Sequence, residues 1–199
     1  AGVVPTYWKE PDRTPISSDE AVRLWAAEAH EILLGVAAHY NKVIRAGELI
    51  SRVQASTGVL TDIPATEWLP RVLHQIVHRC HATGEPPLTS LVINALDGKV
   101  GVAYAEVLRL QGLTVTNALG RERQAAKARL DCYRAFAKDV PANATPQLSP
   151  QLQRVVPPPA RARAASRTVL PVVPDKPLNR ICPTCFLETP ITGECQNCM

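Results

Sequence analysis

The sequence of 199 residues lacks any long apolar run, which excludes a membrane protein built from spanning helices. Its richest apolar stretch, Ile32–Ala38, has seven residues and is interrupted by Gly35, whereas a spanning helix needs about twenty. No basic segment followed by an apolar one opens the chain, so no secretory signal is expected and a cytoplasmic location is predicted. Aromatic residues are scarce at 5%, but 46% of the residues are apolar, which is enough for a buried core.

The sequence also lacks the short motifs that mark common active sites. It contains no Gly-rich phosphate-binding loop, no Gly-x-Ser-x-Gly turn and no His-Glu-x-x-His helix. His30-Glu31 has no second histidine at the required spacing, and Glu28 and Glu48 stand singly at polar helix positions. We therefore predict a protein that is not an enzyme.

Positive charge is concentrated toward the C-terminal part of the chain. Residues 120–180 carry twelve Lys and Arg against four Asp and Glu, whereas the rest of the chain carries ten against fourteen. Residues 140–179 contain nine of the eighteen prolines, and proline removes backbone donors and favours extended chain. We predict a flexible linker over residues 139–179, either a basic arm for an anionic partner or a solvated spacer. The candidate phosphate contacts in it are Arg161, Arg163 and Arg167.

The spacing of apolar residues predicts a folded, mainly α domain with a small β-hairpin over residues 17–138. Ser17 with Glu20 forms a capping-box pattern, Gly58 ends the second helix, and Asp97-Gly98 is a hairpin turn. The expected elements are a helix at 19–39, a strand at 43–45, a helix at 46–57, a helix that is capped by Thr66 and ends before Gly84, a hairpin of 91–94 with 99–101, and a helix at 117–136.

This order of elements over about residues 21–101 resembles a winged helix-turn-helix domain. It is also similar to the small DNA-binding half of alkyltransferase-like proteins, which carry a reactive cysteine in a Pro-Cys-His-Arg motif. The corresponding stretch here is Pro87–Ser90, without cysteine, so alkyl transfer is not expected. The whole layout resembles uncharacterised actinobacterial proteins that join a domain of this kind to a Pro/Arg-rich tether and a terminal zinc ribbon.

Two Cys-x-x-Cys pairs stand near the C-terminus, separated by nine residues. Each pair can supply two thiolates to one tetrahedral Zn²⁺, and a tip of about twenty residues needs such a metal to fold. Two disulfides are the alternative, which the missing secretory signal disfavours. We predict a structural zinc ribbon over residues 180–199, without an open coordination position, whose ligands are Cys182, Cys185, Cys195 and Cys198.

The third expected helix has a polar side opposite its apolar face. In a winged helix this helix enters the major groove, and the hairpin turn contacts phosphate. The predicted DNA contacts are Arg71, His74, Gln75, His78, Arg79 and, in the turn, Lys99. Two alternatives stay open, a solvated face and a metal site on the histidines, although no carboxylate or cysteine of the same face completes a ligand set.

The last expected helix combines several basic residues with an apolar stripe of small residues. The stripe either docks on its own domain or pairs with a second copy, so the protein is a monomer or a homodimer. Cys80 and Cys132 are expected to be buried, reduced and inert.

We predict a DNA-binding accessory or regulatory protein, with the basic tail and zinc ribbon adding contacts to DNA or to a protein. The alternative is an adaptor that uses both folded modules for protein docking, and an enzyme with an unrecognised site is the third class. Residues 17–119 hold eight Lys and Arg against ten Asp and Glu, which favours the adaptor. Cations clustered on the third helix and the turn would favour DNA, and scattered ones the adaptor.

Overall fold

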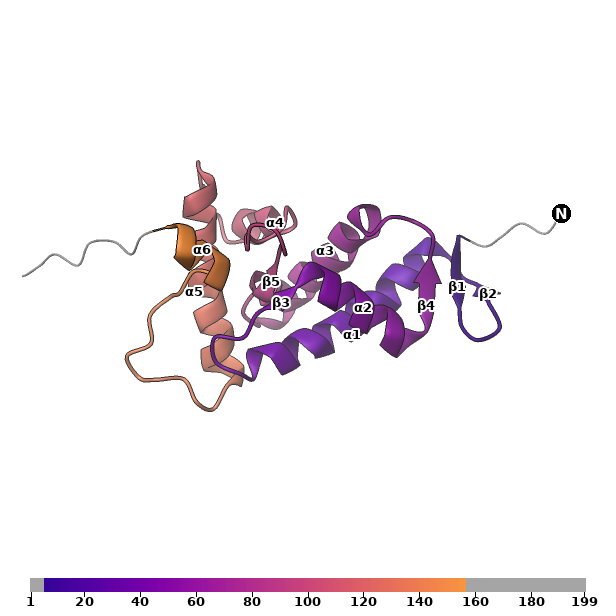
Figure 1. The fold of residues 1–199 in the computed structure, drawn as a ribbon, viewed down its shortest axis with the longest axis horizontal. Helices are drawn as coiled ribbons and strands as arrows, with labels where there is room; N and C mark the ends of the chain where they lie inside the picture. The colour runs from indigo at the N-terminus through magenta and orange to yellow at the C-terminus, as the bar shows by residue number, and fades with distance from the viewer. Residues whose placement is uncertain (1–5, 157–199) are drawn as a thin grey trace, which may run out of the picture. The chain divides into compact units, whose positions relative to one another are not determined.

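A computed structural model of the chain describes residues 6–156, which form a mainly helical unit with two small sheets (Figure 1). The chain divides into two units after Pro159, and the described residues belong to the first. No helix within 6–156 has the length and apolar character that crossing a bilayer demands. The predicted zinc ribbon with its four cysteines and the linker residues Arg161, Arg163 and Arg167 lie outside the described residues.

The central element is helix α1, Ser18–Ala37, which packs against helices α2, Ala46–Thr57, and α3, Ala65–Thr83. The predicted cap is present, because the Ser17 hydroxyl accepts a hydrogen bond from the Glu20 N–H at 3.2 Å. Gly58 ends α2 with a φ of +65°, as predicted. The core around α1 holds Val22, Trp25, Ala29, Leu33, Leu49, Val53, Trp68, Val72 and Ile76.

The prediction that Thr66 caps α3 is wrong by two residues, because the N-cap position is Pro64. The helix begins at Ala65 after Pro64, and no side chain caps it, so Thr66 lies inside the first turn. Its end is as predicted, because Gly84 adopts the left-handed conformation that terminates helices.

The N-terminal boundary at residue 17 was also wrong. Strands β1, Tyr7–Lys9, and β2, Thr14–Pro15, pair with β4, Val59–Thr61, in an antiparallel sheet of order β2-β1-β4. The strands have two or three residues each, so no alternation of apolar and polar residues could mark them in the sequence. Tyr7 packs against the core, and its ring centroid lies 6.1 Å from that of Trp25 on α1, which joins this sheet to the domain.

The predicted hairpin is reduced to a single antiparallel bridge between Ile93 and Val100, with the Asn94 N–H bonded to the Lys99 carbonyl at 2.8 Å. Its turn is present, and Gly98 has a φ of +67°. Strand β5, Val92–Ile93, instead pairs in parallel with β3, Ile44–Arg45. The short 3₁₀ helix η1, Leu88–Leu91, occupies the start of the predicted strand.

Two helices follow the bridge. Helix α4, Tyr104–Leu110, was not predicted, whereas α5, Ala118–Phe136, lies where a helix was expected and is capped by the Asn117 side chain. Helix α5 docks on its own domain, the first of the two alternatives. Its Tyr133 is buried, and the phenol donates to the Lys42 carbonyl at 2.7 Å. Cys80 and Cys132 are buried and free, as predicted.

The folded unit continues past residue 138, so the predicted start of the linker at 139 is wrong. Helix α6, Pro150–Val155, belongs to the same unit, and its Leu152 is buried. The buried Ser149 hydroxyl donates to the Gly98 carbonyl at 2.6 Å. Prolines suggested extended chain here, but Pro150 stands in the first turn of α6, where the missing N–H costs no hydrogen bond.

A second apolar cluster joins α3, α4 and α5. It places α4 against α3, which positions the polar groups described below. Its members are Val77, Val100, Tyr104, Val107, Leu108, Ala125 and Ala128.

Candidate functional site on helix α3

Helix α3 has the two faces that its sequence predicts. The buried side comprises Trp68, Val72, Leu73, Ile76, Val77 and Cys80. The residues predicted to contact DNA lie on the exposed side, namely Arg71, His74, Gln75, His78 and Arg79. The periodicity of apolar residues therefore placed this face correctly.

The cations of this face and of the turn are largely engaged with carboxylates. Arg71 Nη2 lies 2.7 Å from Asp19 Oδ1, and Lys99 Nζ lies 3.5 Å from Asp97 Oδ2. Both pairs are exposed, and such pairs contribute little to stability and exchange readily. Gln75 and Arg79 line a shallow hollow together with Arg23, Ala26, Ala27 and Ile76.

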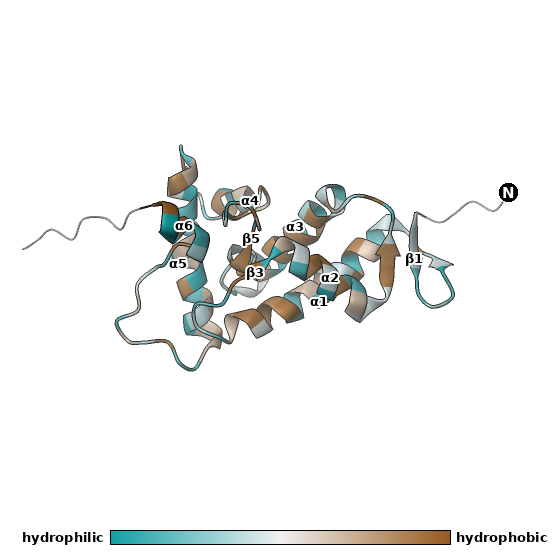
Figure 2. Ribbon diagram, in the orientation of Figure 1, coloured by the Kyte–Doolittle hydropathy of each residue, from teal (hydrophilic) through white to brown (hydrophobic). Residues whose placement is uncertain are grey.

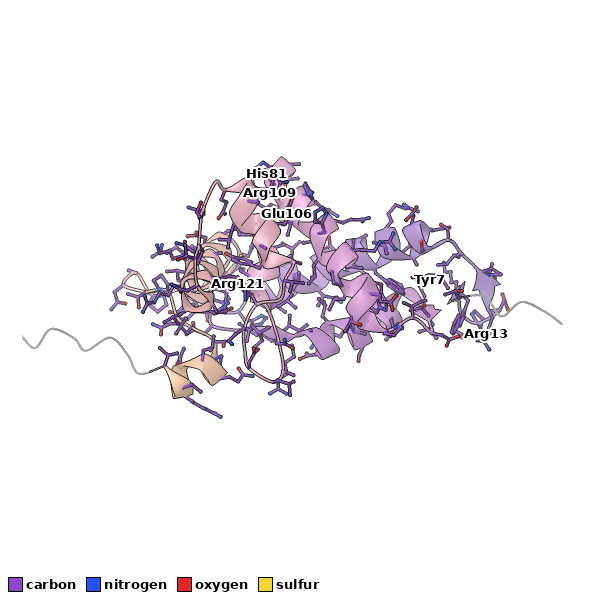
Figure 3. All side chains as sticks on the ribbon, turned by 90° about the horizontal axis from the view of Figure 1, so that it is seen from above. Tyr7, Arg13, His81, Glu106, Arg109 and Arg121 are labelled. Atoms are coloured by element: carbon purple, nitrogen blue, oxygen red, sulfur yellow. The ribbon has the colours of Figure 1, made fainter. Side chains whose placement is uncertain are left out.

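His74 and His78 face a carboxylate from the neighbouring helix. Their Nε2 atoms are 3.3 Å apart and lie 3.6 Å and 3.1 Å from Glu106 Oε1. Arg109 holds both oxygens of the same carboxylate, with its Nε donating to Glu106 Oε2 at 2.7 Å and its Nη2 donating to Glu106 Oε1 at 2.5 Å (Figure 3). These arginine hydrogen bonds, aided by the two histidines, lower the pKa of Glu106 to about 2.

Glu106 was not among the predicted site residues because it lies on α4, a helix that the sequence did not predict. A signal was available, since Tyr104, Val107 and Leu108 have the spacing of one apolar helix face. The pairing of α4 with α3 is a tertiary contact made through the second apolar cluster. His81 lies apart from the trio and lines a small hollow with Val77, Cys80, Glu85, Pro87, Val107, Leu110 and Gln111.

A second group, His30, Cys80 and Glu85, joins α1 to the turn after α3. His30 is 2% exposed, and its Nε2 lies 2.9 Å from Glu85 Oε2. The hydrogen bond from His30 lowers the pKa of Glu85. Because His30 is buried and hydrogen-bonded directly to Glu85, we infer that this group has a structural role.

Acid should weaken the fold through Glu85. Its pKa is depressed in the folded state, so its stabilising contribution is full above the unfolded pKa, about 4.3, and is lost as the pH falls through the folded value. We expect the wild type to lose more unfolding free energy than Glu85→Gln between pH 5 and pH 3, measured by urea unfolding. Glu31→Gln is the control, because Glu31 is 66% exposed and 3.6 Å from the same histidine. Equal losses in the wild type and Glu85→Gln would contradict this role.

No protein family, curated protein or solved structure matches this chain. The resemblances to winged-helix, alkyltransferase-like and actinobacterial tethered proteins therefore stay predictions. The chemistry of the described residues carries the functional argument.

Exposed Lys and Arg side chains without a salt bridge lie on several elements of residues 6–156, including Arg23 on α1, Arg79 on α3 and a group of three on α5. Arg123, Lys127 and Arg134 are exposed and are spaced four and seven residues apart, which places them on one side of the helix. None of the three forms a salt bridge within residues 6–156. We call these three residues the α5 basic face. Figure 2 shows hydrophilic residues along α5 and α6, and exposed Lys138 and Arg154 add charge there.

Proposed function

We propose that the protein binds DNA without catalysing a reaction on it, and that the α5 basic face makes phosphate contacts. The observation that carries this proposal is three exposed cations on one side of a helix, none paired with a carboxylate in the described unit. Cations of this kind neutralise phosphates and release counterions from DNA. In the sequence they are followed by Arg154 and then by Arg161, Arg163 and Arg167, which extend the proposed contact.

We also propose that side chains of α3 contact the edges of DNA bases. Arg79 and Gln75 are exposed and open to contact, whereas Arg71 would first have to leave Asp19. A structural Zn²⁺ on Cys182, Cys185, Cys195 and Cys198 would fold the predicted C-terminal ribbon. The ribbon would then provide a second binding surface, for DNA or for a protein.

The adaptor function is the second candidate, and two observations favour it. Exposed cations without a salt bridge are scattered over several elements of residues 6–156 rather than clustered on α3 and the turn, and apolar residues flank the turn. Leu96 is 95% exposed and Val102 is 74% exposed, on either side of the predicted phosphate-contacting turn. Apolar residues beside a turn suit a protein partner better than a phosphate. Glu106, directed at the histidines of α3, would also repel phosphates from that part of the helix.

The salt dependence of binding tests where DNA is contacted. The variant Arg123→Gln/Lys127→Gln removes two charges from the α5 basic face, and Arg71→Gln/Arg79→Gln removes two from α3. We expect the first variant to reduce the magnitude of the negative slope of the logarithm of the binding constant against log salt by about 1.8. Each lost phosphate contact contributes about 0.9 to that slope. The measurement is fluorescence anisotropy of the full chain with a random duplex over a salt series.

The α3 variant removes the same number of charges, and because α3 is proposed to contact base edges rather than phosphates, it should change the slope on a random duplex little. The reverse pattern would assign the contact to α3 instead of α5. Failure of the unsubstituted chain to bind duplex at low salt would reject DNA binding altogether. The adaptor function would then be tested with Leu96→Ser/Val102→Ser.

A further inference from the structure

We propose that His74, His78 and Glu106 form a binding site for a divalent transition-metal ion, with Zn²⁺ the best match, which fastens α4 to α3. This site is separate from the four cysteines predicted to hold zinc at the C-terminus, and it does not depend on DNA binding. Its ligands come from two helices that the second apolar cluster already holds together.

The distances among the three ligand atoms match the edges of a metal tetrahedron. Zinc bonds of 2.0–2.1 Å at tetrahedral angles separate neighbouring ligand atoms by about 3.3–3.4 Å. The Nε2 atoms of His74 and His78 are 3.3 Å apart, and they lie 3.6 Å and 3.1 Å from Glu106 Oε1. One ion therefore reaches all three atoms without movement of either helix.

The three atoms are also electronically suited to a cation. Neutral imidazole nitrogens and a carboxylate oxygen each offer a lone pair, and Glu106 Oε1, which accepts a hydrogen bond from Arg109 Nη2 at 2.5 Å, keeps a second lone pair for an ion. A metal ion satisfies all three at once. Two imidazoles with one carboxylate form a donor set that Zn²⁺ favours, and with only three protein ligands a fourth position stays open to water or to a partner's side chain.

The surroundings hold the ligands in place and leave them accessible. His74 and His78 are one helical turn apart, so both side chains leave α3 on the same side. Arg109 orients the carboxylate through Glu106 Oε2, and neighbouring groups that hold a ligand in this way are common at metal sites. The side chains of His74 and His78 are 54% and 45% exposed, so an ion can enter from solvent.

The decisive measurement is the response of the histidine ring nitrogens to zinc in the full chain after chelation. The chain has five histidines, so two-bond ¹H–¹⁵N spectra can resolve each one. On titration with ZnCl₂ we expect the Nε2 resonances of His74 and His78 to shift together, while those of His30, His39 and His81 stay in place. Zinc bound per chain, measured by mass spectrometry under non-denaturing conditions, should fall by one in His78→Ala and stay unchanged in His81→Ala.

Glu106→Gln separates a three-ligand site from a simple histidine pair. Loss of the carboxylate should weaken zinc binding at this site at least tenfold, while far-UV circular dichroism in chelator stays that of the wild type. A change below twofold would show that only the two histidines bind and would overturn the site. Absence of shifts at His74 and His78 would also overturn it and would leave a metal-free ion-pair cluster of these residues with Arg109. Cys185→Ser should leave these shifts intact, which separates this site from the predicted ribbon.

Discussion

Replacement of Arg129 by methionine should lower the free energy of unfolding by about 3–5 kcal/mol, because it leaves a buried carboxylate without a partner. Arg129 is 2% exposed and Glu122 is 1% exposed, and Arg129 Nη2 lies 3.7 Å from Glu122 Oε2. Burial raises the pKa of Glu122 and lowers that of Arg129, so each charge depends on the other for compensation.

Arg129 also connects three separate parts of the chain. Its Nε donates to the Ser90 carbonyl at 2.8 Å, and its Nη1 donates to the Gln147 carbonyl at 3.1 Å. Glu122 in turn accepts from the Val100 N–H at 3.1 Å. The pair therefore ties α5 to η1, to the bridge at Val100 and to the loop before α6, and a methionine replaces none of these bonds.

Urea unfolding monitored by circular dichroism measures this effect. Arg123→Met is the matched control, an exposed arginine on the same helix, and should change the unfolding free energy by less than about 0.5 kcal/mol. Arg129→Met/Glu122→Leu should recover part of the loss, because it removes both buried charges. Equal stability of Arg129→Met and Arg123→Met would refute the structural role of the pair.

Trp25→Ala should destabilise the protein by a similar amount, about 3–5 kcal/mol, which is usual for removal of a fully buried aromatic side chain. Trp25 is 0% exposed, and its ring centroid lies 4.2 Å from that of Trp68. Its indole N–H donates to the Val59 carbonyl at 3.1 Å, which fastens α1 to β4. The substitution removes the ring contact of Trp25 on α1 with Trp68 on α3, together with one hydrogen bond to the N-terminal sheet.

Trp25→Phe separates the two contributions. A phenylalanine ring keeps most of the packing but leaves the buried Val59 carbonyl without its donor, for which we expect a loss of about 1–3 kcal/mol. Both variants are compared with the wild type by urea unfolding followed by circular dichroism. A loss below 1 kcal/mol in Trp25→Ala would mean that this tryptophan is not central to the core.

Most boundaries of the long helices, though not the start of α3, could be predicted from the sequence because their signals are local. The hydroxyl of Ser17 caps α1, Gly58 and Gly84 end α2 and α3, and Asn117 caps α5, each through atoms a few residues away. The apolar periodicity of α3 likewise separated its buried side from its exposed side. Strands of two or three residues and the seven-residue α4 are too short for such patterns to stand out.

The candidate metal site could be predicted only in part. His74 and His78 are a helix-spaced pair that the sequence displays, but Glu106 follows 28 residues after His78 and reaches it only because α4 packs on α3. Arg123 and Arg129 likewise could be placed on one basic helix from the sequence. Only the packing of the chain shows that Arg123 is exposed and Arg129 is buried.

The sequence by itself determined the mainly helical fold, the faces of α3 and the concentration of positive charge after residue 120, because these follow from composition and short-range spacing. Tertiary structure alone decided which charges are paired, which are buried and which remain open to a partner. The physical reason is that a salt bridge, a metal site or a buried ion pair requires atoms within a few ångströms, and their separation along the chain does not specify that distance.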